Sequence, residues 1–179
     1  MIDAFNEVGL LPPNYMPIKT NIVEVVERFC TSKQRSILLR GLISYREELH
    51  NFELEGYQWI DGSFVTDKEN REKDSDSGKA PNDIDVLTIY KLPDGATQET
   101  IADRMVFDKK YVMRKYKIDA FPIEMQTLLS ENGILKLAHW VNLFSHTKVN
   151  ERKNFLHIPL GSVDDSNALE LINSKYPLQ

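Results

Sequence analysis

Two short stretches of sequence decide the fold: Ile60-Asp61-Gly62-Ser63-Phe64 and Asn82-Asp83-Ile84-Asp85-Val86. The first is a Gly-Ser turn after an apolar run, and the second places Asp83 and Asp85 within another apolar run. Because side chains alternate along a strand, Asp83 and Asp85 project to the same face. Two carboxylates so near to each other repel unless a cation lies between them, and Mg²⁺ is the simplest such cation. A Gly-Ser turn beside the ion would offer backbone N–H groups to a phosphate, which indicates nucleotide chemistry.

The composition is typical of a soluble globular protein. The 179 residues are 41% hydrophobic and 27% charged, and we expect 1–179 to form a single domain. A net charge of −5 argues against broad, sequence-independent binding to nucleic acid. The single cysteine, Cys30, excludes an internal disulfide and a Cys-based zinc site. No run approaches the ~18 apolar residues of a membrane span, and no signal peptide precedes the body. We therefore expect a cytoplasmic protein with no membrane partner.

An arm and two helices are predicted before the Gly-Ser turn. Several prolines near the N-terminus predict an extended arm over 1–20, laid over the body. A helix over about 22–30 follows, with Thr20 or Asn21 as its cap, and a longer helix begins after Ser32. Both helices carry an apolar stripe along one face.

Charged side chains in two further places are assigned to the surface. Arg35, Arg40 and Arg46 lie on the flanks of the second helix, where solvated positions are expected in preference to phosphate binding. Residues 67–79 contain no apolar side chain and carry mixed charges. Such a run cannot bury anything, so we predict a mobile polar loop over 67–80.

Strands and helices alternate after this loop. The expected elements are strands over 84–90, 117–123 and 155–160, helices over about 98–107 and 131–145, and a short helix from Asp164 or Asp165. Residues 108–117 are basic and receive no assignment. Pro159 places the last strand at an edge of the sheet. The helix over 131–145 is expected to point these side chains inward: Ile134, Leu135, Ala138, Val141, Leu143 and Phe144.

A third carboxylate, Asp119, lies within the apolar run of the strand predicted over 117–123. A buried, unpaired carboxylate costs several kcal/mol, so three in one small sheet require compensation. Shared coordination of metal ions by Asp83, Asp85 and Asp119 is the preferred explanation.

Each of these carboxylates also has a simpler interpretation. Asp83 follows Pro-Asn and is compatible with an ordinary turn. Asp119 is compatible with an ion pair to Lys117 or Arg114. Asp61 is interpreted as a cap of the Gly-Ser turn and receives no catalytic role.

Gly62-Ser63, Asp83-Ile84-Asp85 and Asp119 together resemble the motif set of the polymerase-β-like nucleotidyltransferase superfamily. Within that superfamily, the chain resembles a small bacterial and phage branch of nucleotidyltransferase-like proteins. That resemblance covers most of the chain and rests on Gly62-Ser63-Phe64, on 81–86 and on 118–121.

The resemblance implies an α+β fold, a mixed β-sheet with helices packed mainly on one face. It implies that Gly62 and Ser63 hold a triphosphate, and that Asp83 and Asp85 bind Mg²⁺ or Mn²⁺. Asp119 would complete the metal site and act as general base. The implied reaction moves an NMP from an NTP to a hydroxyl of RNA, protein or a small molecule, with release of pyrophosphate.

Two departures from the pattern favour an alternative function. Asn82 stands where many relatives have serine, and no separate nucleobase-binding domain follows the core. The alternative is a non-catalytic module that binds a nucleotide or a partner protein in a toxin–antitoxin or phage-defence system. A metal-dependent phosphohydrolase built on the same carboxylates is a third possibility.

Overall fold

A computed structural model of the chain describes residues 1–70, 79–97, 99, 105–161 and 163–178. Its centre is a five-stranded mixed sheet in the order β1-β5-β2-β3-β4. The strands are β1 (Ile18–Lys19), β2 (Glu55–Asp61), β3 (Ile84–Lys91), β4 (Ile118–Glu124) and β5 (Leu156–Pro159). The described α-helices are α1 (Ile22–Phe29), α2 (Lys33–His50), α4 (Lys109–Tyr116), α5 (Glu131–Phe144) and α6 (Asp165–Lys175). Short 3₁₀ turns cover Ser63–Val65, Lys68–Asn70 and Met125–Leu129.

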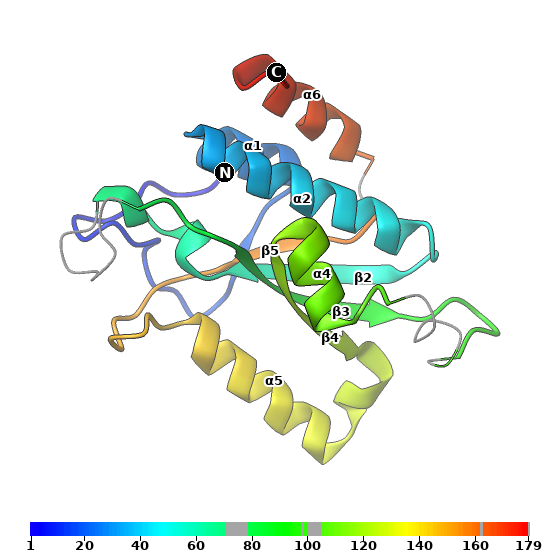
Figure 1. Cartoon of the computed structure of the whole chain (residues 1–179). Coiled ribbons are helices and arrows are strands. Elements are labelled where there is room, and N and C mark those ends of the chain that lie inside the picture. The colour runs from blue at the N-terminus through cyan, green and yellow to red at the C-terminus, as the bar shows by residue number, and fades with distance from the viewer. Residues whose placement is uncertain (71–78, 98, 100–104, 162, 179) are drawn as a thin grey trace.

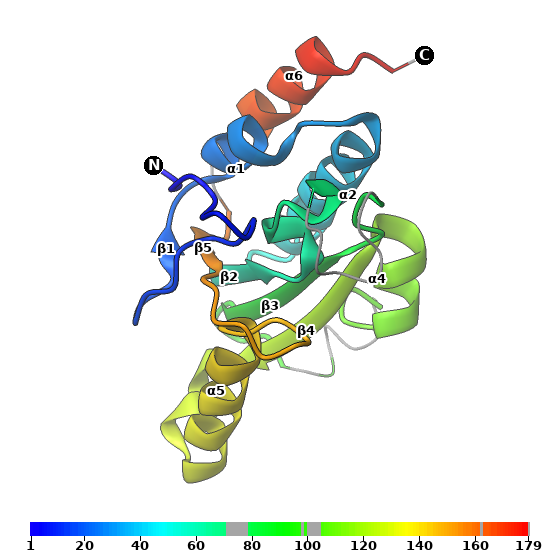
Figure 2. The same ribbon diagram turned by 90° about the vertical axis from the view of Figure 1, so that its left-hand side faces the viewer.

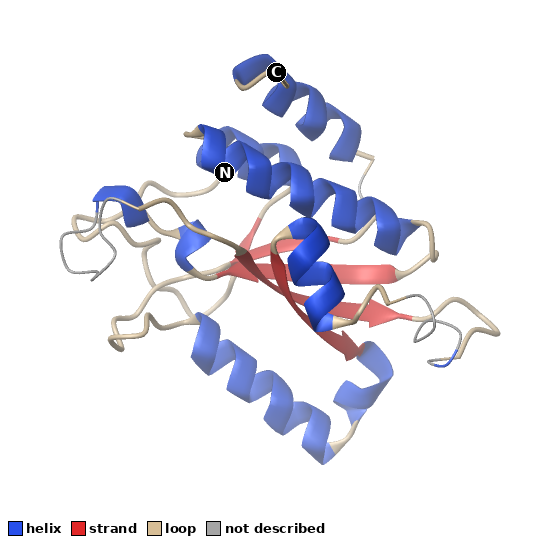
Figure 3. Cartoon of the chain, in the orientation of Figure 1, coloured by secondary structure: helices blue, strands red, loops and turns tan. Residues whose placement is uncertain are grey.

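The helices lie mainly on one face of the sheet, which confirms the predicted α+β fold (Figures 1 and 3). Helices α1, α2, α4 and α6 cover that face and enclose the larger apolar core. Among the described α-helices, α5 alone lies on the opposite face, over a smaller core, as the rotated view in Figure 2 also shows. On β3, Ile84 and Val86 face the larger core whereas Leu87 faces the smaller one. Asp85 therefore lies on the face that α5 partly covers.

Side-chain caps explain where the first two helices begin. Asn21 accepts a hydrogen bond from the backbone N–H of Glu24 at 2.9 Å, and Ser32 accepts one from Arg35 at 3.2 Å. These bonds satisfy N–H groups that have no partner inside the helix. Both predicted helices are thereby confirmed, and α5 and α6 match the predicted positions of the later helices.

The N-terminal segment reaches the sheet through the two residues of β1. These pair in parallel with β5, and Leu10 and Leu11 are buried on the way. Strand β5 is consequently an inner strand, and its predicted place at an edge is wrong. Pro159 is tolerated because β1 pairs only with the first two residues of β5.

The expectation of solvated arginines on α2 is wrong for Arg35 and Arg46, which are 2% and 0% exposed. Arg46 donates to Asp165 of α6 at 3.0 Å and to Gln58 of β2 at 2.9 Å. Arg40 is half-buried and donates to the carbonyl of Tyr176. These arginines link elements distant in sequence, which the helical pattern of α2 alone could not indicate.

The inward face predicted for α5 is largely wrong. Of the side chains expected inside, Ile134 and Leu135 are 60% exposed, Ala138, Val141 and Leu143 are also exposed, and Phe144 alone is buried. The helix contacts the sheet through a different stripe that contains Leu137, Trp140 and Phe144, and Gly133 is buried against the turn before the helix. The helix has no second layer above it in the described structure, so its other apolar side chains face outward.

Two predictions fall partly outside the described residues. In the polar loop predicted over 67–80, residues 71–78 are not described, whereas Lys68–Asn70 forms a 3₁₀ turn. In the helix predicted over 98–107, residues 98 and 100–104 are not described. In the described part of that stretch, Val106 is buried and Met105 is exposed.

Candidate functional site

Three aspartates lie side by side where the end of β2 meets the beginnings of β3 and β4. Strand β2 runs antiparallel to β3, with Asp61 opposite Asp85, and β3 runs parallel to β4, with Asp85 opposite Asp119. Residues in direct register share a face of the sheet. Asp61, Asp85 and Asp119 therefore form a row, called the aspartate row below, on the α5 side. Asp61 had received no role in the site from sequence alone.

Lysines neutralise both outer members of the aspartate row. Lys153 and Asp61 are both buried and form an ion pair, and Lys153 also donates to the carbonyl of Phe144 at 3.1 Å. Lys109 lies 2.8 Å from Asp119 and 4.5 Å from the centre of the Phe121 ring. The partner of Asp119 is thus neither Lys117 nor Arg114. Burial raises the pKa of Asp61, and its contact with Lys153 opposes that rise.

The central member, Asp85, differs from its neighbours. Within the described part of the chain, neither Asp85 nor Asp83 has a hydrogen bond or an ion pair to a side chain. Partial burial raises the pKa of Asp85 to about 6, and the negative charges of Asp83 and Asp119 add to the rise. Asp83 and Asp85 are therefore the carboxylates whose negative charge a bound cation would stabilise most.

Gly62 lies directly against the Asp85 carboxylate. Its φ of +82° is in the left-handed region, and a Cβ atom built there would be 2.0 Å from Oδ2 of Asp85. Only glycine allows this backbone conformation and this close approach together. The sequence therefore brings the Gly-Ser turn and the Asp-x-Asp motif into contact, as the motif analysis required.

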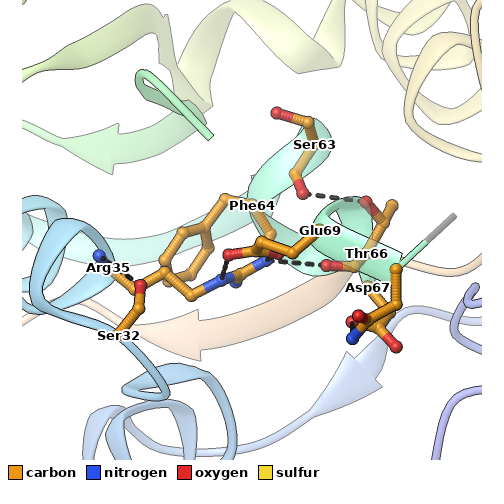
Figure 4. A network of polar contacts seen from close by, with 8 residues as sticks. Ser32, Arg35, Ser63, Phe64, Thr66, Asp67 and Glu69 are labelled. Atoms are coloured by element: carbon orange, nitrogen blue, oxygen red, sulfur yellow. Dashed lines mark hydrogen bonds and ion pairs between the residues drawn. The ribbon is translucent and has the colours of Figure 1, made fainter. Parts of the chain in front are cut away.

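Ser63 begins the 3₁₀ turn that follows Gly62. Its carbonyl accepts hydrogen bonds from the N–H of Thr66 at 3.3 Å and from the Thr66 hydroxyl at 2.8 Å. In Figure 4 its hydroxyl points away from the polar network beneath the turn. The hydroxyl is thus available to a ligand.

The donor atoms of the site suit a hard divalent cation, because Asp83, Asp85 and Asp119 supply carboxylate oxygens. They are not gathered around one point. Among the described residues, no group of three His, Cys, Asp or Glu side chains is close enough to hold a metal ion. The Asp119 carboxylate forms an ion pair with Lys109 instead. The predicted coordination of metal ions by Asp83, Asp85 and Asp119 therefore stays a prediction.

A cavity of about 850 Å³ lies at the opposite end of the sheet and contains none of these aspartates. Its walls come from the end of α2, the start of β2 and the ends of β3 and β5, with His50, Glu55 and Lys91 among the lining side chains. This cavity is therefore separate from the aspartate row.

Replacing Asp85 by asparagine is expected to stabilise the metal-free protein at pH 8 by about 1–3 kcal/mol. The pKa of Asp85 in the folded chain, about 6, exceeds its ordinary value of 3.8, so folding favours the protonated form. Its favourable contribution is complete below pH 3.8 and is lost as the pH rises through 6. Urea unfolding with a chelator at pH 4, 6 and 8 measures the effect. The free energy of unfolding of Asp85→Asn should exceed that of wild type by an amount that grows as the pH rises. A variant less stable than wild type at pH 8 would contradict the electrostatic interpretation.

Comparison with known proteins places most of the chain in one family. Residues 3–159 match the sequence model of DUF6932, described as a family of unknown function. The chain belongs to the DUF6932 family. The DUF6932 region includes Gly62, Ser63, Asp83, the aspartate row and both paired lysines, whereas α6 follows it. No curated protein and no solved structure matches the chain. No described helix has the length and apolar character needed to cross a membrane.

Proposed function

We propose that this DUF6932 protein is a metal-dependent nucleotidyltransferase that moves an NMP from an NTP to a hydroxyl acceptor. The observation that carries the proposal is the contact of Gly62 with the Asp85 carboxylate, at the sheet end where Asp83 and Asp119 also lie. Among the described residues, Asp83 and Asp85 form no ion pair. A glycine turn beside two such carboxylates suits a substrate that brings both phosphate and a divalent cation.

The side chains have distinct roles in this proposal. Asp83, Asp85 and Asp119 would hold Mg²⁺ or Mn²⁺, which neutralises the charge that develops on the phosphates. The hydroxyl of Ser63 would donate to a phosphate oxygen. Asp119 would accept the proton of the attacking hydroxyl. The oxygen of that hydroxyl would bond to the α-phosphorus while the bond between the α-phosphorus and pyrophosphate breaks. Lys109 would have to leave Asp119 before that carboxylate acts, and its exposed side chain is free to move.

The experiment incubates the purified chain with each labelled NTP, Mg²⁺ or Mn²⁺, and RNA, protein and small-molecule acceptors. We expect a labelled product from wild type, and a loss of at least about 100-fold in Asp83→Asn and Asp85→Asn. Asp94→Asn is the matched control, because Asp94 is exposed at the other end of β3. No product with any NTP and acceptor, or product that both variants retain, would overturn the proposal.

One observation favours a second candidate, a nucleotide-binding or partner-binding module without turnover. The ion pair between Lys109 and Asp119 leaves the third carboxylate engaged, and the described carboxylates do not converge on one point. A role in a toxin–antitoxin or phage-defence pair, in the cytoplasm, would fit such a module. Calorimetry with ATP, GTP, CTP and UTP plus Mg²⁺ separates the two candidates, since tight binding without any product supports the second.

A further inference from the structure

The guanidinium of Arg35 lies beneath the Gly-Ser turn and is 2% exposed (Figure 4). Its Nε donates to Glu69 at 2.7 Å, and one Nη donates to the second oxygen of the same carboxylate at 2.8 Å. The guanidinium also donates to the carbonyls of Phe64 at 2.7 Å and Thr66 at 2.8 Å. One buried side chain of α2 thus holds three residues of the segment that follows Gly62.

These hydrogen bonds hold the turn on one side, and the Ser63 hydroxyl points away from that side (Figure 4). The Phe64 carbonyl belongs to the 3₁₀ turn that Ser63 begins, and Thr66 follows as the C-cap of that turn and is hydrogen-bonded to the Ser63 carbonyl. The Phe64 ring is fully buried, 5.4 Å from the ring of Phe29, with the guanidinium 5.3 Å from its centre. The two carbonyls cannot shift without breaking their hydrogen bonds to Arg35, and the buried ring packs against the guanidinium. The orientation of Ser63 therefore depends on Arg35.

Glu69 makes this arrangement specific for arginine. A buried guanidinium requires a counter-ion and partners for its N–H groups, and the Glu69 carboxylate provides both in bidentate geometry. A lysine ammonium has three donors on one atom and cannot reach the carboxylate and two separate carbonyls together. Glu69 in turn belongs to the 3₁₀ turn Lys68–Asn70, so this described start of the charged segment is tied to the Gly-Ser turn.

We propose that Arg35 is the positioning residue of the Gly62-Ser63 turn, acting through the carbonyls of Phe64 and Thr66, with Glu69 as its counter-ion. The inference rests on the proposed function only in that the turn is taken to bind the phosphates of the nucleotide. Arg35 touches no substrate in this proposal. It fixes the backbone that does.

The test compares Arg35→Lys and Glu69→Gln with Arg40→Lys, a matched change on the same helix that faces α6 instead. Hydrogen exchange of the amides over 63–66 should accelerate at least about tenfold in Arg35→Lys, less in Glu69→Gln, and not in Arg40→Lys. With an active wild type, KM for the NTP should rise about tenfold in Arg35→Lys while kcat changes less than about threefold. A role in folding alone would lower Tm and the active fraction but leave KM unchanged.

The outcomes separate this inference from the proposed function. Inactive wild-type protein with faster exchange over 63–66 in Arg35→Lys overturns the nucleotidyltransferase proposal and supports the role of Arg35. Unchanged exchange over 63–66 in both variants overturns the role of Arg35 whatever the activity. Glu69→Gln keeps the test decisive if Arg35→Lys does not fold, because it retains the guanidinium and removes only the charge of its partner.

Discussion

Lys153→Met is expected to lower the free energy of unfolding by about 3–5 kcal/mol, because it leaves a buried carboxylate without its cation. Lys153 and Asp61 are both buried, and the ammonium also bonds to the Phe144 carbonyl at the end of α5. Methionine fills a similar volume but donates no hydrogen bond to the Asp61 carboxylate or to the Phe144 carbonyl. Urea unfolding followed by tryptophan fluorescence measures the loss, since Trp59 precedes Asp61 on β2.

The loss should depend on pH. Burial already raises the pKa of Asp61, and removing Lys153 raises it further. A carboxyl with a raised pKa in the folded state loses its favourable contribution as the pH increases through that pKa, so the deficit should be larger at pH 8 than at pH 5.

Two variants test the cause of the destabilisation. The double variant Asp61→Asn/Lys153→Met should recover most of the lost stability, because no uncompensated charge remains. Lys109→Met removes the partner of Asp119, but Lys109 is 58% exposed, so the cost should stay below about 1 kcal/mol. A double variant as unstable as Lys153→Met alone would show that the Phe144 contact or the shape of the lysine matters instead.

Local patterns predicted most elements of the fold. Asn21 and Ser32 act on the helices directly after them, and the apolar runs that contain Asp85 and Asp119 form adjacent strands. The errors involve contacts over long distances. The burial of Arg35 depends on Glu69, and the burial of Arg46 depends on Asp165 at the other end of the chain. No local period carries that information.

The candidate site was predicted only in part, for the same reason. Gly62, Asp83, Asp85 and Asp119 stood out because a turn or a carboxylate interrupts an apolar run. Asp61 also ends such a run, and pairing β2 with β3 as antiparallel strands would have placed it beside Asp85. Lys153 offered no such signal, since it follows α5 in an irregular segment and meets Asp61 only in the folded chain.

Helix α5 shows a second feature that the apolar periodicity of a sequence does not predict. An apolar stripe predicts which side chains prefer burial, but the surface available to bury them depends on the neighbouring elements. Gly133 packs so closely against the turn before α5 that an added Cβ would be 2.0 Å from the carbonyl oxygen of Thr127. That contact helps to set the rotation of the helix, and Ile134 and Leu135 face outward as a result.

Under the proposed nucleotidyltransferase function, Gly62→Ala is expected to abolish metal-dependent nucleotide binding, and it should lower the free energy of unfolding by about 1–3 kcal/mol. The added methyl would stand 2.0 Å from Oδ2 of Asp85, and the residue would have to keep a φ of +82°. Because the carboxylate is the end of a side chain, it can rotate away, so the fold should survive while Asp85 leaves its position. Calorimetry with each NTP and Mg²⁺ measures the loss of binding, and urea unfolding measures the loss of stability.

Gly95→Ala separates backbone strain from the collision with Asp85. Gly95 has nearly the same φ, +81°, but no atom lies within 4 Å of its added Cβ. It should lose a similar amount of stability from strain and keep full nucleotide affinity. The double variant Gly62→Ala/Asp85→Ala removes both the collision and the Asp85 charge, so it should be at least as stable as Gly95→Ala, yet still fail to bind. Nucleotide affinity that persists in Gly62→Ala would mean that the contact between Gly62 and Asp85 is not part of the binding site.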